Sequence, residues 1–317
     1  MIMMFRPVTI VAVFAAALAA APSLASERIY VTFGDNSVVS YDVSLPTSTD
    51  IQNSAQTFAT TNIDNPMGLA FDAAGNLFVA SLNSNRILRY NNQGVFQSAI
   101  TSNVVSPYSV AFDPAGNLYV ANNNGGSSTI SRYTPQGTFV SAISGNLDNP
   151  RMVAFDAAGN LYAANLSSSN IAKFNSAGTF TATIGSSANL NGVTGLAFAA
   201  SGNLYASNPG NQTISIFNPA GTYLSNIAIT SGLQTRGIAF DTAGNLYTAN
   251  RNSSNISKFN SAGVFQFSWS TASDPRYVAF THSPIPVPEP ATLGLAGVAA
   301  AGFGWWILRR RGAARLG

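Results

Sequence analysis

One short segment recurs along the chain at a nearly constant spacing. Residues 71–78 read Phe-Asp-Ala-Ala-Gly-Asn-Leu-Phe, and five later segments repeat this pattern in whole or in part. The copies place their Phe at Phe71, Phe112, Phe155, Phe198, Phe240 and, in the last partial copy, Phe280, which are 40 to 43 residues apart. A repeat of this length, built from short apolar runs and Gly-containing turns, is typical of the four-stranded blade of a β-propeller.

Each repeat contains the parts that such a blade requires. In the first repeat an apolar run ends at Phe71, a turn with Gly75 follows, and residues 76–80 form a second apolar run. Two further runs are separated by a turn that ends in Gly94. Glycine at these turns supplies the positive φ that a tight reversal needs. The first two runs are apolar at nearly every residue, which predicts strands packed on both faces.

The two ends of the repeat region predict how the ring closes. The N-terminal copy, around residues 28–31, has a second strand but no first strand, whereas the C-terminal copy, residues 276–280, has a first strand and nothing after it. The two fragments together make one blade. We therefore predict an all-β fold over residues 27–282, a six-bladed β-propeller of four-stranded blades closed by pairing of its N- and C-terminal strands.

The repeat resembles that of NHL-repeat propellers. Residues 65–68 (Asn-Pro-Met-Gly) and 72–79 match the NHL pattern closely, and the resemblance covers nearly the whole middle of the chain, although the fourth copy has Ala199 in place of Asp. The related streptogramin-lyase and gluconolactonase propellers are enzymes, and they resemble this chain in blade pattern only.

Residues 1–25 have the features of a secretory signal peptide. Arg6 provides a positive start, residues 8–21 form an apolar run, and Ser23 and Ala25 are small residues suited to cleavage before Ser26. We expect signal peptidase to remove this segment. An uncleaved N-terminal anchor is the alternative, although the run is short for a membrane span.

The C-terminal end has three parts in a fixed order. A Pro-rich linker at 283–290 is followed at 291–308 by 18 uncharged, mostly apolar residues, which predict a hydrophobic transmembrane helix, and then by an Arg-rich tail at 309–317. Arginines flanking a span are expected on the cytoplasmic side. The characteristic residues of the linker and tail are Pro288, Glu289, Pro290, Arg309, Arg310 and Arg311.

This order of parts resembles the PEP-CTERM sorting signal of Gram-negative bacteria. The resemblance implies that an exosortase-type enzyme processes the tail during export, and that the helix anchors the protein in the membrane until then. An ordinary single-pass C-terminal anchor is the alternative. Both interpretations place the propeller outside the inner membrane, in the cell envelope or the extracellular space.

Composition excludes several classes of protein. The chain has no Cys, so it has no disulfide framework, thiol zinc site or Cys nucleophile. Its formal net charge is +3, but residues 26–286 contain 10 basic and 11 acidic residues, so the basic excess lies in the terminal segments. We therefore expect no nucleic-acid partner.

The sequence offers few residues for catalysis, and we expect no enzyme activity, cofactor or metal site. The one His, His282, and both Glu, Glu27 and Glu289, lie at the edges of the predicted propeller. The four recurring Asp each stand three residues before a turn Gly, where a carboxylate usually accepts hydrogen bonds from the turn backbone. These residues are Asp72, Asp113, Asp156 and Asp241. The Asn residues that end the second strands are likewise expected to bond to loop backbone groups.

One set of equivalent positions is rich in Arg. The residues four before each repeat Phe are Met67, Tyr108, Arg151, Thr194, Arg236 and Arg276. Because this position begins the innermost strand, its side chains should rim one mouth of the central channel. Guanidinium groups suit carboxylate, sulfate or phosphate, and Tyr108 and Tyr277 could provide flat surfaces for sugar rings. The alternative is that each Arg bonds to neighbouring carbonyls or to Asp64, Asp148 or Asp274. Whether Arg251 faces the same mouth depends on a loop that the sequence does not place.

Three interpretations of function follow. The favoured one is an exported, non-enzymatic binding or scaffold propeller of the cell envelope or extracellular matrix, with an anionic exopolysaccharide or a protein partner at the channel mouth. The second is a lyase- or lactonase-type enzyme with a metal held by Asp and Asn oxygens. The third is a structural surface protein without a ligand, in which all the mouth arginines are paired internally.

Overall fold

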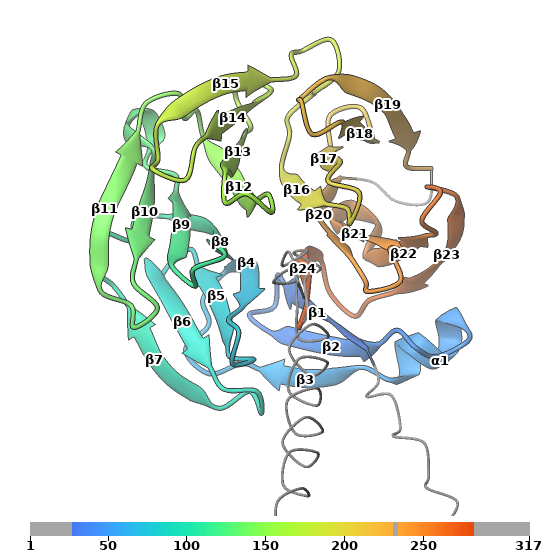
Figure 1. Ribbon diagram of the computed structural model, residues 1–317. Coiled ribbons are helices and arrows are strands. Elements are labelled where there is room, and N and C mark those ends of the chain that lie inside the picture. The colour runs from blue at the N-terminus through green and yellow to red at the C-terminus, as the bar shows by residue number, and fades with distance from the viewer. Residues whose placement is uncertain (1–26, 231–233, 282–317) are drawn as a thin grey trace, which may run out of the picture.

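The computed structural model describes residues 27–230 and 234–281, which form six four-stranded antiparallel sheets around a central channel (Figure 1). This arrangement confirms the six-bladed propeller that the repeat predicts. The inner strands of successive blades lie next to one another around the ring, and each sheet extends outward from the channel.

We number the blades from the one that holds both chain ends. Blade 1 contains β24 (Pro275–Phe280), β1 (Arg28–Phe33), β2 (Val38–Asp42) and β3 (Gln56–Ala59). Blades 2 and 3 contain β4 (Pro66–Phe71), β5 (Leu77–Ser81), β6 (Arg86–Tyr90) and β7 (Phe96–Ile100), then β8 (Pro107–Phe112), β9 (Leu118–Asn122), β10 (Thr129–Tyr133) and β11 (Phe139–Ser144). Blade 4 contains β12 (Pro150–Phe155), β13 (Leu161–Asn165), β14 (Asn170–Phe174) and β15 (Phe180–Ile184).

The last two blades complete the ring. Blade 5 contains β16 (Gly195–Phe198), β17 (Leu204–Asn208), β18 (Thr213–Phe217) and β19 (Tyr223–Ala228), and blade 6 contains β20 (Thr235–Phe240), β21 (Leu246–Asn250), β22 (Asn255–Phe259) and β23 (Phe265–Ser270). Within residues 27–230 and 234–281, three short helices lie between strands: α1 (Ser48–Asn53), η1 (Gly125–Ser127) and η2 (Arg251–Ser253). Helix α1 was not predicted from the sequence; the Thr47 side chain caps it by accepting a hydrogen bond from the Asp50 backbone N–H.

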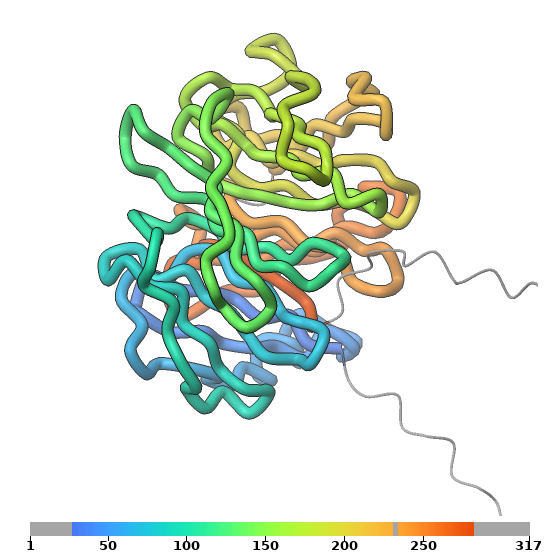
Figure 2. The backbone as a smooth tube through the Cα atoms, turned by 60° about the vertical axis from the view of Figure 1, so that its left-hand side comes forward, coloured from blue at the N-terminus to red at the C-terminus, as the bar shows by residue number. Residues whose placement is uncertain are grey.

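Blade 1 is shared between the two ends of the described chain. β1 pairs antiparallel with β24, with Ile29 opposite Phe280 and Val31 opposite Val278. Figure 2 shows the blue and red ends of the chain side by side in this blade. The predicted closure is therefore confirmed, and each inner strand of the described ring pairs with the second strand of its blade.

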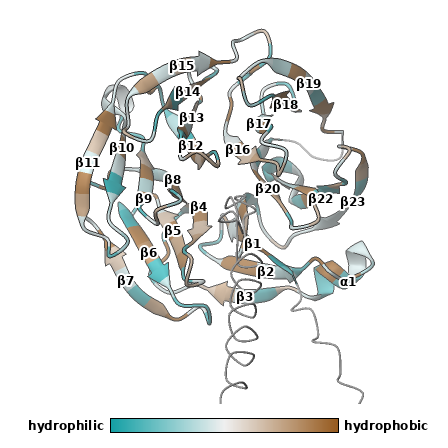
Figure 3. Cartoon of the chain, in the orientation of Figure 1, coloured by the Kyte–Doolittle hydropathy of each residue, from teal (hydrophilic) through white to brown (hydrophobic). Residues whose placement is uncertain are grey.

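The same edge-to-face aromatic contact joins every neighbouring pair of blades. The Phe that ends each inner strand packs against the aromatic residue of the second strand in the preceding blade, with ring centroids 4.8 to 5.3 Å apart. Such pairs contribute about 0.5–1.5 kcal/mol each beyond the area they bury. The pairs are Tyr30–Phe71, Phe78–Phe112, Tyr119–Phe155, Tyr162–Phe198, Tyr205–Phe240 and Tyr247–Phe280. The repeat Phe is thus the residue that holds the blades together, and Figure 3 shows hydrophobic stretches in all six blades.

In four blades the turn after the inner strand is organised by an Asp, at Asp72, Asp113, Asp156 or Asp241. In blade 2 the Oδ1 atom of Asp72 accepts hydrogen bonds from the backbone N–H groups of Ala74 (3.0 Å) and Asn76 (2.8 Å), and its Oδ2 atom accepts one from the Asn76 side chain (2.8 Å). Asp113 and Asp156 make the same three bonds. The predicted role of the Asp in these turns is therefore confirmed.

Inner strands approach one another closely where Gly occurs. A Cβ atom added to Gly195 would collide with the carbonyl oxygen of Arg236, and one added to Gly237 would collide with the backbone of Tyr277. Glycine is needed at these two positions because of the space, not because of the backbone conformation.

Several predicted segments lie outside the described residues. These are the signal peptide at 1–25, the linker at 283–290, the hydrophobic segment at 291–308, the tail at 309–317 and His282. Within the described part of the chain, no helix has the length and apolar character needed to cross a bilayer.

Candidate functional site

The mouth of the channel at which the inner strands begin carries the arginines. Arg151 on β12 and Arg236 on β20 line one pocket of about 320 Å³ together with Thr194, Gln234 and the ring of Tyr277. Arg251 of η2 lies beside this pocket, because its backbone N–H donates to the carbonyl oxygen of the lining residue Gln234 (3.3 Å). We call Arg151, Arg236, Arg251 and Arg276 the arginine mouth.

Arg151 and Arg236 face the pocket. The Arg151 guanidinium lies over the ring of Tyr108, 3.7 Å from its centroid, and its Nε atom is buried with no hydrogen-bond partner among the described residues. Burial lowers the pKa of Arg236, and the positive charges of Arg251 and Arg151 lower it further. An anion bound in a pocket that two cations line lowers the electrostatic energy of both.

Arg276 and Arg251 are already engaged. The Arg276 Nη1 atom donates hydrogen bonds to the side-chain oxygen of Asn65 and to the Pro66 carbonyl (3.3 Å) in blade 2. Arg251 forms an ion pair with Asp274 at 3.7 Å. For Arg276 the structure therefore shows the bonding to a neighbouring blade that the sequence analysis left open.

Only some of the arginines in the arginine mouth form ion pairs with carboxylates of the described residues. Among the described residues the ion pairs are Arg89–Asp72 and Arg251–Asp274. Neither involves Arg151 or Arg236, and no carboxylate is among the described residues that line their pocket.

Tyr277 closes the floor of the arginine pocket. Its side chain is only 2% exposed, and its hydroxyl donates to the Arg151 carbonyl oxygen at 3.4 Å, from blade 1 to blade 4 on the opposite side of the ring. Burial raises the pKa of Tyr277, while the charges of Arg236 and Arg151 act against this rise. The expectation that Tyr277 offers an open flat surface to a sugar is therefore wrong, because its ring fills the channel.

A size pattern in the sequence could have identified this plug. The residue three before each repeat Phe is small in four blades and large only in blades 1 and 4. In ring order from blade 2 these residues are Gly68, Ser109, Met152, Gly195, Gly237 and Tyr277. The small residues let neighbouring inner strands approach, and the two large ones occupy the channel between opposite blades.

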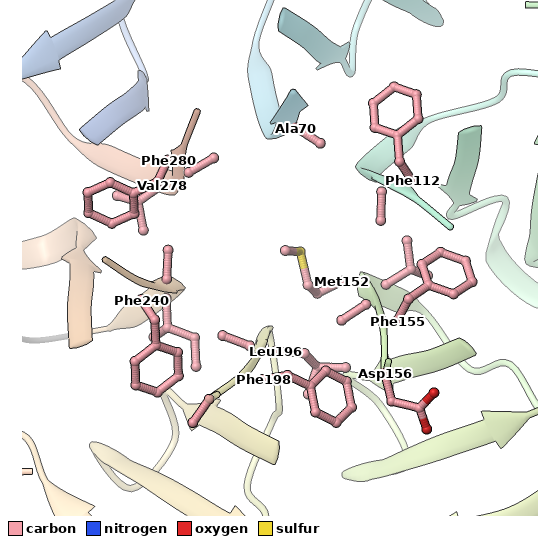
Figure 4. A pocket seen from close by; sticks show the side chains of 18 of the residues that line it. Ala70, Phe112, Met152, Phe155, Asp156, Leu196, Phe198, Phe240, Val278 and Phe280 are labelled. Atoms are coloured by element: carbon pink, nitrogen blue, oxygen red, sulfur yellow. The ribbon is translucent and has the colours of Figure 1, made fainter. Parts of the chain in front are cut away.

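At the other mouth, where the inner strands end, the channel widens into an apolar cavity of about 370 Å³ (Figure 4). We call this cavity the apolar chamber. Met152 points into its centre, whereas Phe112, Phe155 and Phe198 are turned outward between the blades. All six inner strands line the apolar chamber, whereas β12, β20 and β24 contribute Arg151, Arg236 and Tyr277 to the cationic pocket at the opposite end.

Most predicted polar positions act within the fold. Asn122 accepts from the Val105 backbone N–H (3.1 Å) and donates to the Asn103 carbonyl (3.2 Å), and Asn165 makes equivalent bonds in blade 4. This confirms the structural role predicted for these Asn residues. Among the described residues, the Asn250 side chain forms hydrogen bonds with the side chains of Thr235, Thr248, Asn255 and Ser257.

A set of cations on the third strands was not predicted from the sequence. Each lies over the aromatic ring of the second strand in its own blade, 5.1 to 5.7 Å from the centroid. These residues are Arg89, Arg132, Lys173 and Lys258. Blade 5 lacks both the turn Asp and this cation, with Ala199 and Ile216 in their places, and this joint substitution was visible in the sequence.

Among the described residues no group of three or more His, Cys, Asp or Glu side chains is placed to hold a metal ion.

Comparison with known proteins identifies the C-terminal segment. Residues 286–311 match the family model of the PEP-CTERM protein-sorting motif, which includes all six sorting residues named from the sequence. The motif implies export, sorting to the cell envelope and processing by an exosortase. A search of curated proteins gives no match.

Solved structures show what the propeller resembles. A propeller chain in a nidogen/laminin complex has a TM-score of 0.69 at 18% identity, covering 81% of this chain and 99% of that one. A protein of unknown function from Bacteroides caccae has a TM-score of 0.63 at 12% identity, with 80% and 98% covered. The virginiamycin B lyase from Staphylococcus aureus has a TM-score of 0.61 at 14% identity, with 80% and 87% covered. At these identities the likeness shows the fold alone. The chain is a six-bladed β-propeller that carries a PEP-CTERM sorting motif.

Proposed function

We propose that this propeller is a non-enzymatic binding module of the cell envelope or extracellular matrix, and that its arginine mouth binds an acidic group of an exopolysaccharide. The observation that carries the proposal is one pocket that both Arg151 and Arg236 line, with no carboxylate among its described lining residues.

The electrostatics of the pocket favour an anionic ligand. The buried Nε atom of Arg151 is a donor without a partner among the described residues. That atom is enclosed by the fold, so an acidic ligand would bond to the other donors of the guanidinium, where charge-assisted hydrogen bonds are about twice as strong as neutral ones. A planar carboxylate matches the fork of donors that each guanidinium presents.

The shape of the pocket limits how much of a polymer it takes. Tyr277 blocks the floor, and the volume of about 320 Å³ lies at the small end of ligand pockets, which run from about 300 to 1,000 Å³. A polysaccharide chain therefore cannot thread through the central channel. The ligand is therefore a chain end or a projecting acidic sugar, such as a uronate, with its carboxylate between Arg151 and Arg236 and its hydroxyls near the Gln234 amide.

The use of the carboxylates in the fold supports a non-enzymatic role. The Oδ1 atoms of Asp72, Asp113 and Asp156 each accept two backbone N–H bonds from their turns. Asp241 is 3% exposed and accepts from the Asn245 backbone and from the hydroxyl of Tyr247. Carboxylates held in this way are committed to turn structure.

The terminal segments complete the proposal. Signal peptidase removes residues 1–25, and the hydrophobic segment at 291–308 holds the protein in the membrane, with its Arg tail in the cytoplasm, until the exosortase acts. The propeller then remains in the envelope or matrix, where the acidic polymer is present.

The test measures saccharide binding by residues 26–286, which contain every strand of the closed ring. Calorimetric titration with short oligouronates should give saturable binding, and a neutral oligosaccharide of equal length should give none. Arg151→Gln combined with Arg236→Gln should weaken binding at least tenfold. Arg86→Gln is the matched control, because it removes an exposed Arg of β6 outside the pocket and should leave affinity unchanged. Absence of oligouronate binding, or equal binding by the double variant, overturns the proposal.

A further inference from the structure

We propose that the apolar chamber is a second, independent binding site, and that it takes an uncharged apolar molecule of two to three aromatic rings. This site lies at the opposite mouth from the arginines and shares no lining residue with their pocket.

The walls of the chamber are made by one repeated position. The residue before each repeat Phe is Ala in all six blades, and these small side chains leave the space that larger ones would fill. The six are Ala70, Ala111, Ala154, Ala197, Ala239 and Ala279. Five of them are half-buried although they lie on the innermost strands, so they remain open to the chamber. Apolar surface left open in a cavity gains free energy when an apolar ligand covers it, by about 25 cal/mol per Å².

The polar groups of the chamber lie at its mouth. Among the described lining residues Asp156 is the one with a charge, and its carboxylate already accepts bonds from its turn and from the Tyr162 hydroxyl (3.0 Å). Ser201 and Thr281 are the remaining polar side chains of the lining. An anionic ligand would lie near Asp156 without a partner cation in the lining, so the chamber favours an uncharged ligand.

The dimensions define the size of the ligand. A volume of about 370 Å³ is more than twice that of an apolar protein cavity of about 150 Å³ that binds benzene. It is also within the range of small-molecule sites, which are mostly apolar with few polar groups. Met152, at the centre of the channel, would contact the inner end of the ligand (Figure 4). Its flexible thioether suits an irregular apolar contact.

The experiment uses N-phenyl-1-naphthylamine, an uncharged dye whose fluorescence rises in apolar surroundings. Titrated into residues 26–286, it should saturate at one site per chain. Ala154→Phe fills the chamber, and Ala197→Met fills part of it, so both should weaken binding at least tenfold while the thermal midpoint confirms that they fold. The matched control is Ala158→Phe, which adds the same side chain on an exposed turn residue that does not line the chamber.

Failure of the proposal would be unambiguous. Absence of saturable dye binding by the unaltered fragment, or binding that both filling variants retain, overturns it. A crystal structure with 1-iodonaphthalene locates the site without any variant, because iodine in the chamber supports the proposal and iodine elsewhere contradicts it. Failure of oligouronate binding would leave this result unaffected, since the two sites are separate.

Discussion

The two mouths of the channel are built by the same six strands, yet they differ in how strictly they follow the repeat. Where the strands end, every blade has Ala followed by Phe, and the Phe joins neighbouring blades through aromatic contacts. Where the strands begin, the equivalent residues are Met, Tyr, Arg, Thr, Arg and Arg. The regular end is set by packing between blades. At the irregular end the side chains do not have to make these aromatic contacts between blades, and three of the six positions there are Arg.

The two mouths are separated by Tyr277, so replacing it is the strongest way to break the comparison. Tyr277→Ala should destabilise the propeller by about 3–5 kcal/mol, as large aromatic truncations in cores do. Loss of the ring also removes the floor of the arginine pocket. Urea denaturation of residues 26–286 measures the effect.

Tyr277→Phe is the control for this change. It keeps the ring and removes one hydroxyl bond to the Arg151 carbonyl, so it should cost only about 1 kcal/mol. Equal stability of the Ala and Phe variants would show that the ring does not fill the channel.

A second prediction concerns the regular mouth. Asp156→Ala leaves the N–H groups of Ala158 and Asn160 without their acceptor and should destabilise the fold by about 1–3 kcal/mol. Oligouronate affinity should remain unchanged, because this turn is at the other end of the channel. Denaturation and titration of the same variant separate the two effects, and a loss of affinity without a loss of stability would contradict the division between the mouths.

A third prediction concerns adding an Asp to blade 5, whose turn lacks one. In blade 5 Ala199 occupies the Asp position, and the Ser201 hydroxyl accepts a long bond (3.4 Å) from the Asn203 backbone. Ala199→Asp should supply the missing acceptors and stabilise the propeller by about 1 kcal/mol. The thermal midpoint should rise by a few degrees. A fall would show that blade 5 needs its cation partner as well, which Ile216→Lys in the same background would test.

The smallest expected effect is the response of the two sites to salt concentration. Oligouronate binding should weaken several-fold between 0.05 and 0.5 M NaCl, because added ions screen the attraction to the arginines. Binding of the apolar dye should stay constant or strengthen slightly over the same range. Matching salt responses for the two ligands would indicate a single site.

The fold was predictable because the length and the pattern of the repeat are typical of a four-stranded propeller blade. The spacing of the Phe residues predicted the blades, and the fragments at residues 28–31 and 276–280 predicted the closure. The gathering of Arg151 and Arg236 at one mouth also followed from equivalent positions in a ring. These predictions succeeded because each depends on backbone geometry that all six blades share.

The remaining features depend on side-chain packing that one repeat does not reveal. The direction of Tyr277 follows from the small residues on neighbouring strands, and the bond from Arg276 to Asn65 depends on the path of a loop in the next blade. The apolar chamber arises because six Ala face one another across a channel of fixed width. A comparison of all six copies at the positions just before Phe could have revealed the plug and the chamber.

The central claim is that the two mouths are separate sites for different chemistries, and one pair of titrations tests it directly. Oligouronate and N-phenyl-1-naphthylamine are each titrated into residues 26–286, into the Arg151→Gln, Arg236→Gln double variant and into Ala154→Phe. The account predicts that the Arg variant loses only the uronate and that Ala154→Phe loses only the dye. One variant that abolishes both, or a ligand that survives its own variant, would contradict it.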